Sequence, residues 1–505
     1  MNTTKASSKT KTAISPTRAE NYPEWYQQVI RAADLAEVSP VRGCMTMKPW
    51  GYAIWENIQH ILDGELKALG HKNVYFPLLI PAHFLEKEAE HIDGFAKECA
   101  VVTHARMIRN EEGKLVPGSP LEEPYIIRPT SETIIGEAYA RWIQSWRDLP
   151  LKLNQWANVM RWEMRTRMFL RTSEFLWQEG HTAHASSDEA RQETLTILDL
   201  YKRFAEVVLA MPVIYGEKTA SERFPGAVNT YCIEAMMQDK KALQAGTSHF
   251  LGQHFSKAFN IQFLNTEGVL EHAFTTSWGV STRLVGGLIM THSDDDGLVL
   301  PPKLAPVHIV ILPVIHKPEQ RASILEYCEK VAEICRAVLW HDQKVIVEID
   351  QRDLPGGEKA WHHVKKGVPI RIEVGGREAD AKTLTVSRRD CAYREKNTIP
   401  LTDFANQIAS ILDEMQKNIY ARAKDFMTKN TVKIDSKKDF YDFFEGEGGG
   451  FAETHWNGDP SIEEQIKKDL NVTIRCIPLI EKPEPGVCPF SGDKSRQRVV
   501  FAKAY

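Results

Sequence analysis

Apolar residues follow a helical pattern most clearly between Trp50 and Gly70. They recur there at intervals of three and four, and the glycine stands where a helix commonly ends, so the pattern predicts an amphipathic helix. The apolar stretch 74–81 that follows contains Pro77 and Pro81, and proline within a strand belongs at the edge of a sheet. An edge strand beside a long apolar helix could form a dimer surface, or it could lie at the surface of a monomer.

Two later segments, 159–163 and 175–181, alternate as strands do, and an arginine-rich loop joins them. Side chains two apart in a strand share a face, so Arg161 and Glu163 would lie beside a row on the second strand. That row consists of Phe175, Trp177, Glu179 and His181. An arginine fork suits a phosphate or carboxylate, and an aromatic face suits a flat base. The hairpin therefore predicts a site for a nucleotide beside a small anion, although a solvated hairpin with surface ion pairs would show the same pattern.

Three other short segments carry polar residues in suggestive positions. Thr130 and Glu132 precede a helical stretch, where they could be a simple N-cap with an acid in the first turn or could grip a ligand. His249 ends an extended segment, and a histidine in such a position is more often a hydrogen-bonded structural residue than one that contacts a ligand. Small residues from Ser277 onward lead to Arg283. They could leave room for a ligand to approach the backbone, or the segment could be a glycine-containing strand that ends in a surface arginine.

After residue 300 the pattern changes to alternating strands and helices. Strands are expected at 307–314, 344–350, 370–374 and 383–387, with helices at 324–339 and 404–429. Basic residues collect within this part of the chain, and they could contact a nucleic acid or form a solvated face. The ones that we single out are Arg352, Lys359, Lys365 and Arg371.

Composition narrows the class of protein. The 505 residues suggest about three domains, and 63 basic against 67 acidic residues give no global sign of a nucleic-acid binder. The 8 cysteines form no CxxC pair, which suits a reducing compartment, and no apolar run approaches the ~20 residues of a membrane span. We expect a cytoplasmic protein without membrane contact. Residues 1–18 are rich in Ser and Thr and lack acids, which predicts a disordered basic tail, with an organelle transit peptide as the alternative.

Taken together, these segments resemble the class II aminoacyl-tRNA synthetases over residues 19–505. The segment 70–79 with Pro77 resembles motif 1, and 161–175 resembles motif 2. The segment 275–283 resembles motif 3, although Ser281 stands where the family commonly has threonine. Arg-Pro-Thr-Ser-Glu at 128–132 and Trp-Gln-Glu-Gly-His at 177–181 have the form seen in prolyl-tRNA synthetases.

The resemblance implies an α+β fold and a division of the chain. A class II antiparallel sheet flanked by helices is expected at 19–300. An α/β anticodon-binding domain would follow at 301–405, and a linker helix with a small C-terminal α+β module at 406–505. The motif 1 proline, here Pro77, lies at the dimer interface in the family, so a homodimer is expected.

The resemblance also implies an activity: L-proline is activated with ATP to prolyl-adenylate and transferred to the 3′ end of tRNA(Pro). Arg161, Glu163 and Arg283 would be the catalytic residues, and Gln244 would help to place the Mg²⁺ that accompanies ATP. The ATP-binding residues would be Arg161, Glu163, Arg171, Thr172, Phe175, Gln244, Thr247, Ser281 and Arg283. The proline-binding residues would be Thr130, Glu132, Arg161, Trp177, Glu179, His181, His249, Ser277 and Trp278. Arg352, Lys359, Lys365 and Arg371 would bind tRNA.

Three further expectations concern what the chain lacks or how it ends. About sixty residues separate His181 from Gln244, too few for an inserted editing domain of ~100 residues. The chain thus resembles the archaeal and eukaryotic form, and a separate deacylase would correct mischarged tRNA. The C-terminal module holds only Cys476 and Cys488, too few for the four-cysteine zinc site of some relatives, so no structural zinc is expected. The terminal Tyr505 would pack toward the active site, as in related enzymes.

Two alternatives remain at this stage. A threonyl enzyme of the same class would share the fold, but its substrate hydroxyl would call for a zinc or a further polar partner. A catalytically inactive paralogue would be expected to lose Arg161, Glu163 or Arg283, and this chain has all three.

Overall fold

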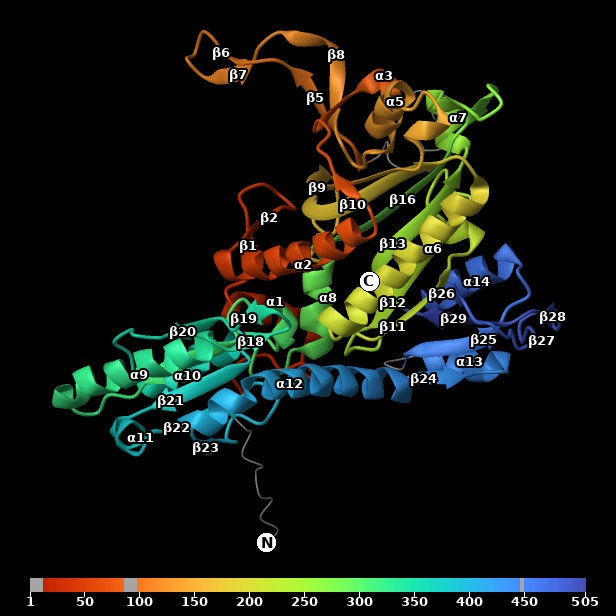
Figure 1. Cartoon of the computed structure of the whole chain (residues 1–505). Helices are drawn as coiled ribbons and strands as arrows, with labels where there is room; N and C mark the ends of the chain where they lie inside the picture. Colours follow the sequence, from red (N-terminus) through yellow and green to blue (C-terminus); the bar gives the residue numbers. More distant parts are fainter. Residues whose placement is uncertain (1–11, 86–97, 446–448) are drawn as a thin grey trace.

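The centre of the molecule is one large sheet (Figure 1). The computed structural model describes residues 12–85, 98–445 and 449–505, and in it eleven strands join in the order β24-β25-β29-β26-β11-β12-β13-β16-β10-β9-β3. In that order the strands are Thr431–Lys433, Phe451–His455, Arg498–Ala502, Thr473–Pro478, Val213–Glu217, Asn229–Met236, Ala242–Gly252, Phe274–Ser281, Glu174–His184, Leu151–Met160 and Lys72–Asn73. Only the two outermost pairs, β24 with β25 and β3 with β9, are parallel.

Helices cover one face of this sheet and form the main core with it. The helix predicted at 50–70 is confirmed as α2 (Pro49–Ala68), which buries Ile54, Ile58 and Leu62. It lies beside α6 (Ser187–Arg203), and both pack against Trp278 and Val280 of β16 in one hydrophobic cluster. With these apolar side chains on the covered face, the alternate side chains of the same strands point to the opposite face. The expected α+β class, an antiparallel sheet flanked by helices, is confirmed.

The proline-containing stretch 74–81 is strand only at its end. β4 (Leu79–Pro81) forms the edge of a three-stranded sheet in the order β4-β8-β5, with β8 at Pro120–Ile127 and β5 at Ala100–His104. The preceding residues are held instead by the fully buried Arg128, whose Nη1 donates to the carbonyl oxygens of Phe76 (2.7 Å) and Pro77 (3.4 Å). Pro77 itself is exposed.

The second predicted unit is confirmed as a five-stranded sheet with helices. Its order is β20-β17-β21-β22-β23, and the first three strands are parallel. These strands are Val347–Ile349, Ile309–Pro313, Ile370–Val374, Thr383–Arg388 and Asn397–Pro400. The predicted helices are α9 (Arg321–Arg336) and the long α12 (Leu401–Lys429), which runs from this unit to the C-terminal module (Figure 1).

The C-terminal module continues the central sheet. Its strand β26 pairs with β11, so that Gly216 lies opposite Pro478 and Glu217 opposite Ile477. Two short helices, α13 (Lys437–Phe444) and α14 (Pro460–Leu470), pack on the module's strands. The module is therefore joined to the central sheet by backbone pairing, and side chains of the two parts also pack together.

The N-terminal residues differ from expectation where the structure describes them. The expected disordered tail covered 1–18, of which 1–11 lie outside the described residues. Ile14 is 2% exposed, and its N–H donates to the carbonyl oxygen of Asp295 at 2.9 Å. Arg18 forms an ion pair with the Asp295 carboxylate at 3.3 Å. Residues 12–18 thus pack on the folded body. No helix among the described residues has the length and apolar character that a membrane span requires.

Candidate active site

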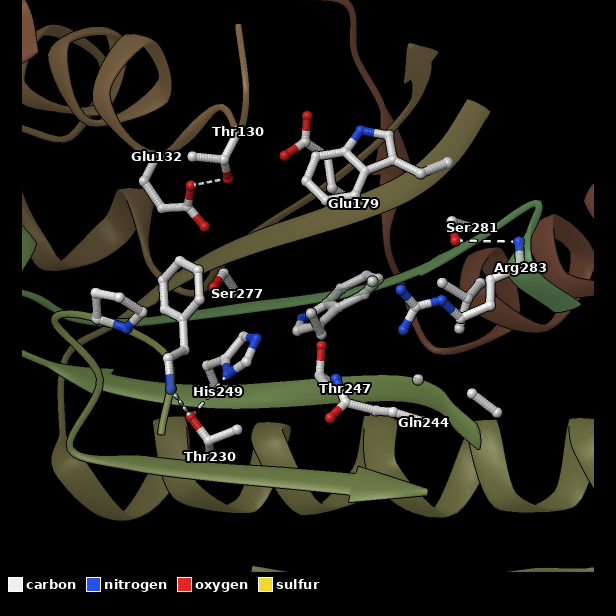
Figure 2. A pocket seen from close by; sticks show the side chains of 18 of the residues that line it. Thr130, Glu132, Glu179, Thr230, Gln244, Thr247, His249, Ser277, Ser281 and Arg283 are labelled. Atoms are coloured by element: carbon white, nitrogen blue, oxygen red, sulfur yellow. Dashed lines mark hydrogen bonds between the residues drawn. The ribbon is translucent and has the colours of Figure 1, made fainter. Parts of the chain in front are cut away.

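A cavity of about 360 Å³ opens on the face of the central sheet that the helices leave uncovered. Strands β10, β13 and β16 form its floor, and the start of α5 (Glu132–Trp142) forms one wall (Figure 2). Most of the predicted ATP and proline residues line it together. They are Thr130, Glu132, Arg161, Phe175, Trp177, Glu179, His181, Gln244, Thr247, His249, Ser277, Trp278, Ser281 and Arg283.

Strand alternation explains how β10 presents its predicted row. Phe175, Trp177, Glu179 and His181 all border the cavity, as expected for residues two apart. The intervening Gln178 points the other way, where its Oε1 accepts a hydrogen bond from the Tyr201 hydroxyl at 2.7 Å. The expected shared face of β10 is confirmed.

The partner strand ends earlier than predicted. β9 stops at Met160, so Arg161 and Glu163 are not strand residues. Arg161 still lies in register, because its N–H donates to the carbonyl oxygen of Ser173 at 2.7 Å. Glu163 lies beyond this pairing, and its carboxylate accepts from Nε of Arg171 at 2.5 Å outside the cavity.

The start of α5 borders the cavity and lacks the side-chain hydrogen bond of a simple helix cap. Ser131 occupies the N-cap position but makes no capping hydrogen bond with its side chain. Its hydroxyl donates instead to Oε1 of Glu179 at 2.5 Å, across the cavity wall. The Thr130 hydroxyl donates to the buried carboxylate of Glu132. The polar groups of this turn therefore organise carboxylates that border the cavity.

Glu179 contacts a glutamine of the neighbouring strand and a histidine of its own strand. Nε2 of Gln155, on β9, donates to Oε1 of Glu179 at 2.5 Å, and Nε2 of His181 lies 3.1 Å from Oε2. Burial alone would lower the pKa of His181, but the hydrogen bond that its ring N–H donates to Glu179 and the charges of Glu132 and Glu179 outweigh burial and raise that pKa above its usual value.

His249, on β13, which is separated from β10 by β16, is in the opposite electrostatic situation. Burial lowers its pKa to about 4, with a contribution from the charge of His181. Nδ1 lies 3.0 Å from the hydroxyl oxygen of Thr230, and the ring of Phe224 stacks on the imidazole with centroids 4.6 Å apart. His249 is neutral at physiological pH.

Two arginines give the cavity a site for anions. Nε of Arg161 donates to the carbonyl oxygen of Pro129 at 3.0 Å, and the guanidinium lies over the rings of Phe175 (5.5 Å) and Trp177 (5.7 Å). Nε of Arg283 donates to the carbonyl oxygen of Leu170 at 3.1 Å. Burial lowers the pKa of both arginines, and the charge of Arg161 contributes to the lowering at Arg283. A bound anion would offset both effects.

Some predicted residues do not take part as expected. Trp278 borders the cavity, and its indole is 2% exposed and packs on His71 and Tyr201 in the core. Its predicted contact with proline stays a prediction. Trp278 lies between Ser277 and Gly279 and therefore faces the other side of the sheet. Arg171 and Thr172, like Glu163, lie outside the cavity lining. The Thr172 hydroxyl donates to the carbonyl oxygen of Glu174 at 2.7 Å.

Sequence reasoning missed one wall of the cavity. It is formed by Glu222, Arg223, Phe224 and Pro225, in the connection between β11 and β12, together with Thr230. This connection has no hydrophobic periodicity, and the only available signal was an aromatic residue beside a proline in a polar loop.

The residues predicted to bind tRNA fall into two environments. Arg352 and Lys359 border a second cavity, of about 250 Å³, which lies at the carboxyl end of β17. Arg321, the first residue of α9, also borders it. Lys359 is largely buried, and its ammonium donates to the carbonyl oxygens of Pro313 (3.1 Å) and Asp350 (3.3 Å).

The other two predicted tRNA residues do not border this cavity. Lys365 is partly exposed, at the end of α10 (Gly356–Lys365). Arg371 is 3% exposed within β21, beside Tyr393, and burial lowers its pKa to about 10. Its position in a central strand places Arg371 inside the fold, and its predicted contact with tRNA stays a prediction.

Known families match all three parts of the chain. Residues 115–292 match the tRNA synthetase class II core domain (G, H, P, S and T), 308–411 match the anticodon binding domain, and 438–505 match the prolyl-tRNA synthetase C-terminal domain. The connection 182–243 consists of the end of β10, α6, β11, β12 and the turns and loops that join them to the start of β13.

Full-length relatives carry one name. The chain is 58% identical to "Proline--tRNA ligase 2" of Anaeromyxobacter dehalogenans over 505 residues, which covers 98% of this chain and 99% of the relative. It is 56% identical to "Proline--tRNA ligase" of Bdellovibrio bacteriovorus, with 98% and 99% covered. It is 58% identical to "Proline--tRNA ligase" of Rhodopirellula baltica, with 98% of each covered. Fold, cavity and similarity over the whole length agree, and the chain belongs to the prolyl-tRNA synthetase family of class II aminoacyl-tRNA synthetases.

Proposed function

We propose that this protein activates L-proline with ATP and transfers it to tRNA(Pro). The observation that carries the proposal is the pairing of charges across one cavity. Buried carboxylates of Glu132 and Glu179 stand on the side of α5, and the guanidinium of Arg161 stands beside an aromatic pair. Free proline is a zwitterion, so its ammonium suits Glu132 and its carboxylate suits Arg161.

The reaction we propose has two steps. First, the proline carboxylate attacks the α-phosphorus of ATP in line, which forms prolyl-adenylate and releases pyrophosphate. Then a hydroxyl of the terminal adenosine of tRNA attacks the activated carbonyl and releases AMP. Neither step needs a covalent bond to the enzyme, so catalysis rests on positioning and on stabilising the charge that develops at phosphorus.

We assign a role to each side chain at the end of the cavity near Arg283, where the phosphates of ATP would lie. Arg161 spans the substrate carboxylate and the α-phosphate, Arg283 holds the γ-phosphate, and Phe175 stacks on adenine. Glu163 and Arg171 act on the adenine amino group and the outer phosphates, which requires their 2.5 Å ion pair to open. Thr172, Thr247 and Ser281 complete the ATP site that we propose.

Magnesium enters this proposal together with ATP. Mg²⁺ prefers oxygen ligands and is commonly bound through few protein groups plus substrate phosphates. The amide oxygen of Gln244, which borders the cavity, is such a ligand. Among the described residues no three His, Cys, Asp or Glu side chains group closely enough to hold a resident metal ion. When bound, magnesium would neutralise charge on the phosphates that Arg161 and Arg283 also contact.

The remaining side chains at the proline end orient the substrate. Thr130 and Glu132 hold the ammonium, while Trp177, His249 and Ser277 shape the space for the ring. Glu179 and His181 complete this end of the cavity, where an imidazolium at His181 would balance the like charges of Glu132 and Glu179. A threonyl enzyme would need a zinc or another polar partner for its substrate hydroxyl, and this cavity offers the neutral, stacked His249 instead.

The remaining proposals concern the domains of the chain, the binding of tRNA and the formation of a dimer. We propose a catalytic domain at 19–300, an anticodon-binding domain at 301–405 and a C-terminal unit at 406–505. Arg352 and Lys359 border a polar cavity suited to a nucleotide of the anticodon, with Lys365 as a nearby phosphate contact. We further propose a cytoplasmic homodimer with the exposed Pro77 at its interface, served by a separate deacylase.

Amino-acid-dependent ATP–pyrophosphate exchange without tRNA, run with all twenty amino acids, tests the activity. Exchange with proline, and at most weak exchange with alanine or cysteine, is expected. Exchange with a different amino acid would keep the fold and overturn the assignment of the proline end. No exchange with any amino acid, in folded protein with magnesium, would favour the inactive paralogue.

A further inference from the structure

A loop of residues 218–225, here called the pocket loop, separates the cavity from the C-terminal module. On its inner side Glu222, Arg223, Phe224 and Pro225 border the cavity. Phe224 is fixed by two contacts: its ring stacks on His249, and its N–H donates to the hydroxyl of Thr230 at 3.0 Å. The pocket loop therefore supplies an aromatic wall at the end of the cavity where Thr230 and His249 lie (Figure 2).

The outer side of the pocket loop is held by one carboxylate of the C-terminal module. The Thr219 hydroxyl donates to Oε1 of Glu463 at 2.9 Å, and the Ser221 hydroxyl donates to Oε2 at 2.7 Å. Glu463 lies in the first turn of α14 and is 4% exposed. One turn further along the same helix, Nζ of Lys467 meets Glu222 at 3.1 Å.

The start of the pocket loop is fixed to the same module. Nζ of Lys218, buried at the end of β11, donates to the carbonyl oxygen of Arg475 at 2.7 Å and to Glu234 at 2.7 Å. The loop is thus anchored at Lys218 and braced along its length by α14. Ordering a polar loop costs conformational entropy, which these contacts offset.

We propose that Glu463 is a positioning residue for proline binding: it holds the pocket loop so that Phe224 closes the proline end of the cavity. An acid in the first turn stabilises a helix without having to be buried. Glu463 is instead buried, and each of its oxygens accepts a hydrogen bond from the pocket loop. The C-terminal module would therefore influence how tightly the amino acid binds. This role rests on the proposed function, the activation of proline.

The proposal predicts a change confined to one substrate. Phe224 stacks on His249 at one end of the cavity, whereas Gln244 and Arg283 lie toward the other end (Figure 2). Loosening the pocket loop should weaken proline binding and leave ATP binding intact. In exchange assays, Glu463→Ala is expected to raise KM for proline by about tenfold, the loss of roughly 1.4 kcal/mol, with KM for ATP unchanged. Glu463→Gln, which keeps one acceptor oxygen, should lie between.

Controls separate positioning from general damage. Glu464→Ala removes the neighbouring exposed glutamate of the same helix and should leave both KM values unchanged. The double variant Thr219→Val/Ser221→Ala removes the loop side of the contact and leaves α14 intact. It should raise KM for proline by a similar factor, and adding Glu463→Ala to it should change little more, because both act through one contact.

Two results would overturn the proposal. One is a folded Glu463→Ala enzyme, with an unaltered melting temperature, whose KM for proline stays within twofold of the wild type. The other is an equal rise in KM for proline and for ATP, which would indicate a general structural role. Wild-type enzyme that shows no proline-dependent exchange would instead refute the proposed function, so the two failures are distinguishable.

Discussion

Nε2 of His181 lies 3.1 Å from Oε2 of Glu179, two residues earlier on the same face of β10. This contact and the charge of Glu132 outweigh burial and raise the pKa of His181. His249 lies on β13, the next strand but one, and burial lowers its pKa to about 4. One histidine of the cavity thus favours the cation and the other the neutral ring. The charge of an imidazolium at His181 would balance the carboxylate of Glu179, and Glu132 is the second carboxylate that borders this part of the cavity.

Glu179→Gln should therefore lower the pKa of His181. Removing the carboxylate charge leaves burial as the largest effect, and burial disfavours the imidazolium, so His181 should lose its proton at a lower pH than in the wild type. NMR titration of ring-labelled histidines would measure the change, with His181→Gln used to assign the resonance. Glu189→Gln, at an exposed site on α6, is the matched control. An unaltered His181 titration in Glu179→Gln would contradict the assignment.

Arg161→Ala should reduce the rate of proline-dependent pyrophosphate exchange by on the order of 10³-fold. Two charge-assisted contacts worth ~2 kcal/mol each would vanish from the transition state. Arg161→Lys keeps the charge but not the planar fork, and should recover only part of the rate. Arg165→Ala removes an exposed arginine of the same loop and serves as the control. Near-normal exchange in Arg161→Ala would remove this side chain from the mechanism.

Metal analysis should find far less than one zinc per chain. A structural zinc site needs four ligands, and Cys476 and Cys488 are the only cysteines of the C-terminal module. EDTA is expected to leave the melting temperature unchanged. It should nevertheless abolish exchange, because ATP needs magnesium, and added Mg²⁺ should restore the activity. A fall in melting temperature with EDTA that zinc alone reverses would refute the prediction.

Regular periodicity made much of this fold predictable. The spacing of apolar residues located α2 and α12 within a few residues, and β21 was predicted with the observed bounds, Ile370–Val374. Alternation placed the β10 row on one face. The same rule places the Trp278 ring on the face of β16 opposite to Ser277 and Gly279, because that residue lies between them.

The features that were missed depend on contacts between distant parts of the chain. Ile14 is buried because the fold brings Asp295 to it, and Glu463 meets Thr219 across 244 positions. Neither pairing leaves a local pattern in the sequence. Arg371 looked like a surface cation because periodicity reports which face a side chain takes, but not whether a neighbouring strand or helix covers that face.

Glu234→Gln should destabilise the junction between the central sheet and the C-terminal module. Its carboxylate is fully buried and accepts from Nζ of Lys218 at 2.7 Å and Nη2 of Arg475 at 2.9 Å. Removing the charge leaves two buried cations without their shared anion, which should cost ~3–5 kcal/mol of unfolding free energy at pH 7. A lower melting temperature would report this loss, and Glu464→Gln, at an exposed position, should show none.

The pH dependence of that effect has a definite sign. Burial alone would raise the pKa of Glu234, but the charges of Lys218 and Arg475 outweigh it and hold the pKa below its usual value. A carboxylate with a lowered pKa in the folded state stabilises the protein above its unfolded pKa of ~4.3 and loses that contribution as pH falls through the folded pKa. The gap in melting temperature between wild type and Glu234→Gln should thus be constant from pH 7 to about 5 and narrow below about 4.3. A gap that stays the same down to pH 3 would show that the charge of Glu234 is not what stabilises the junction.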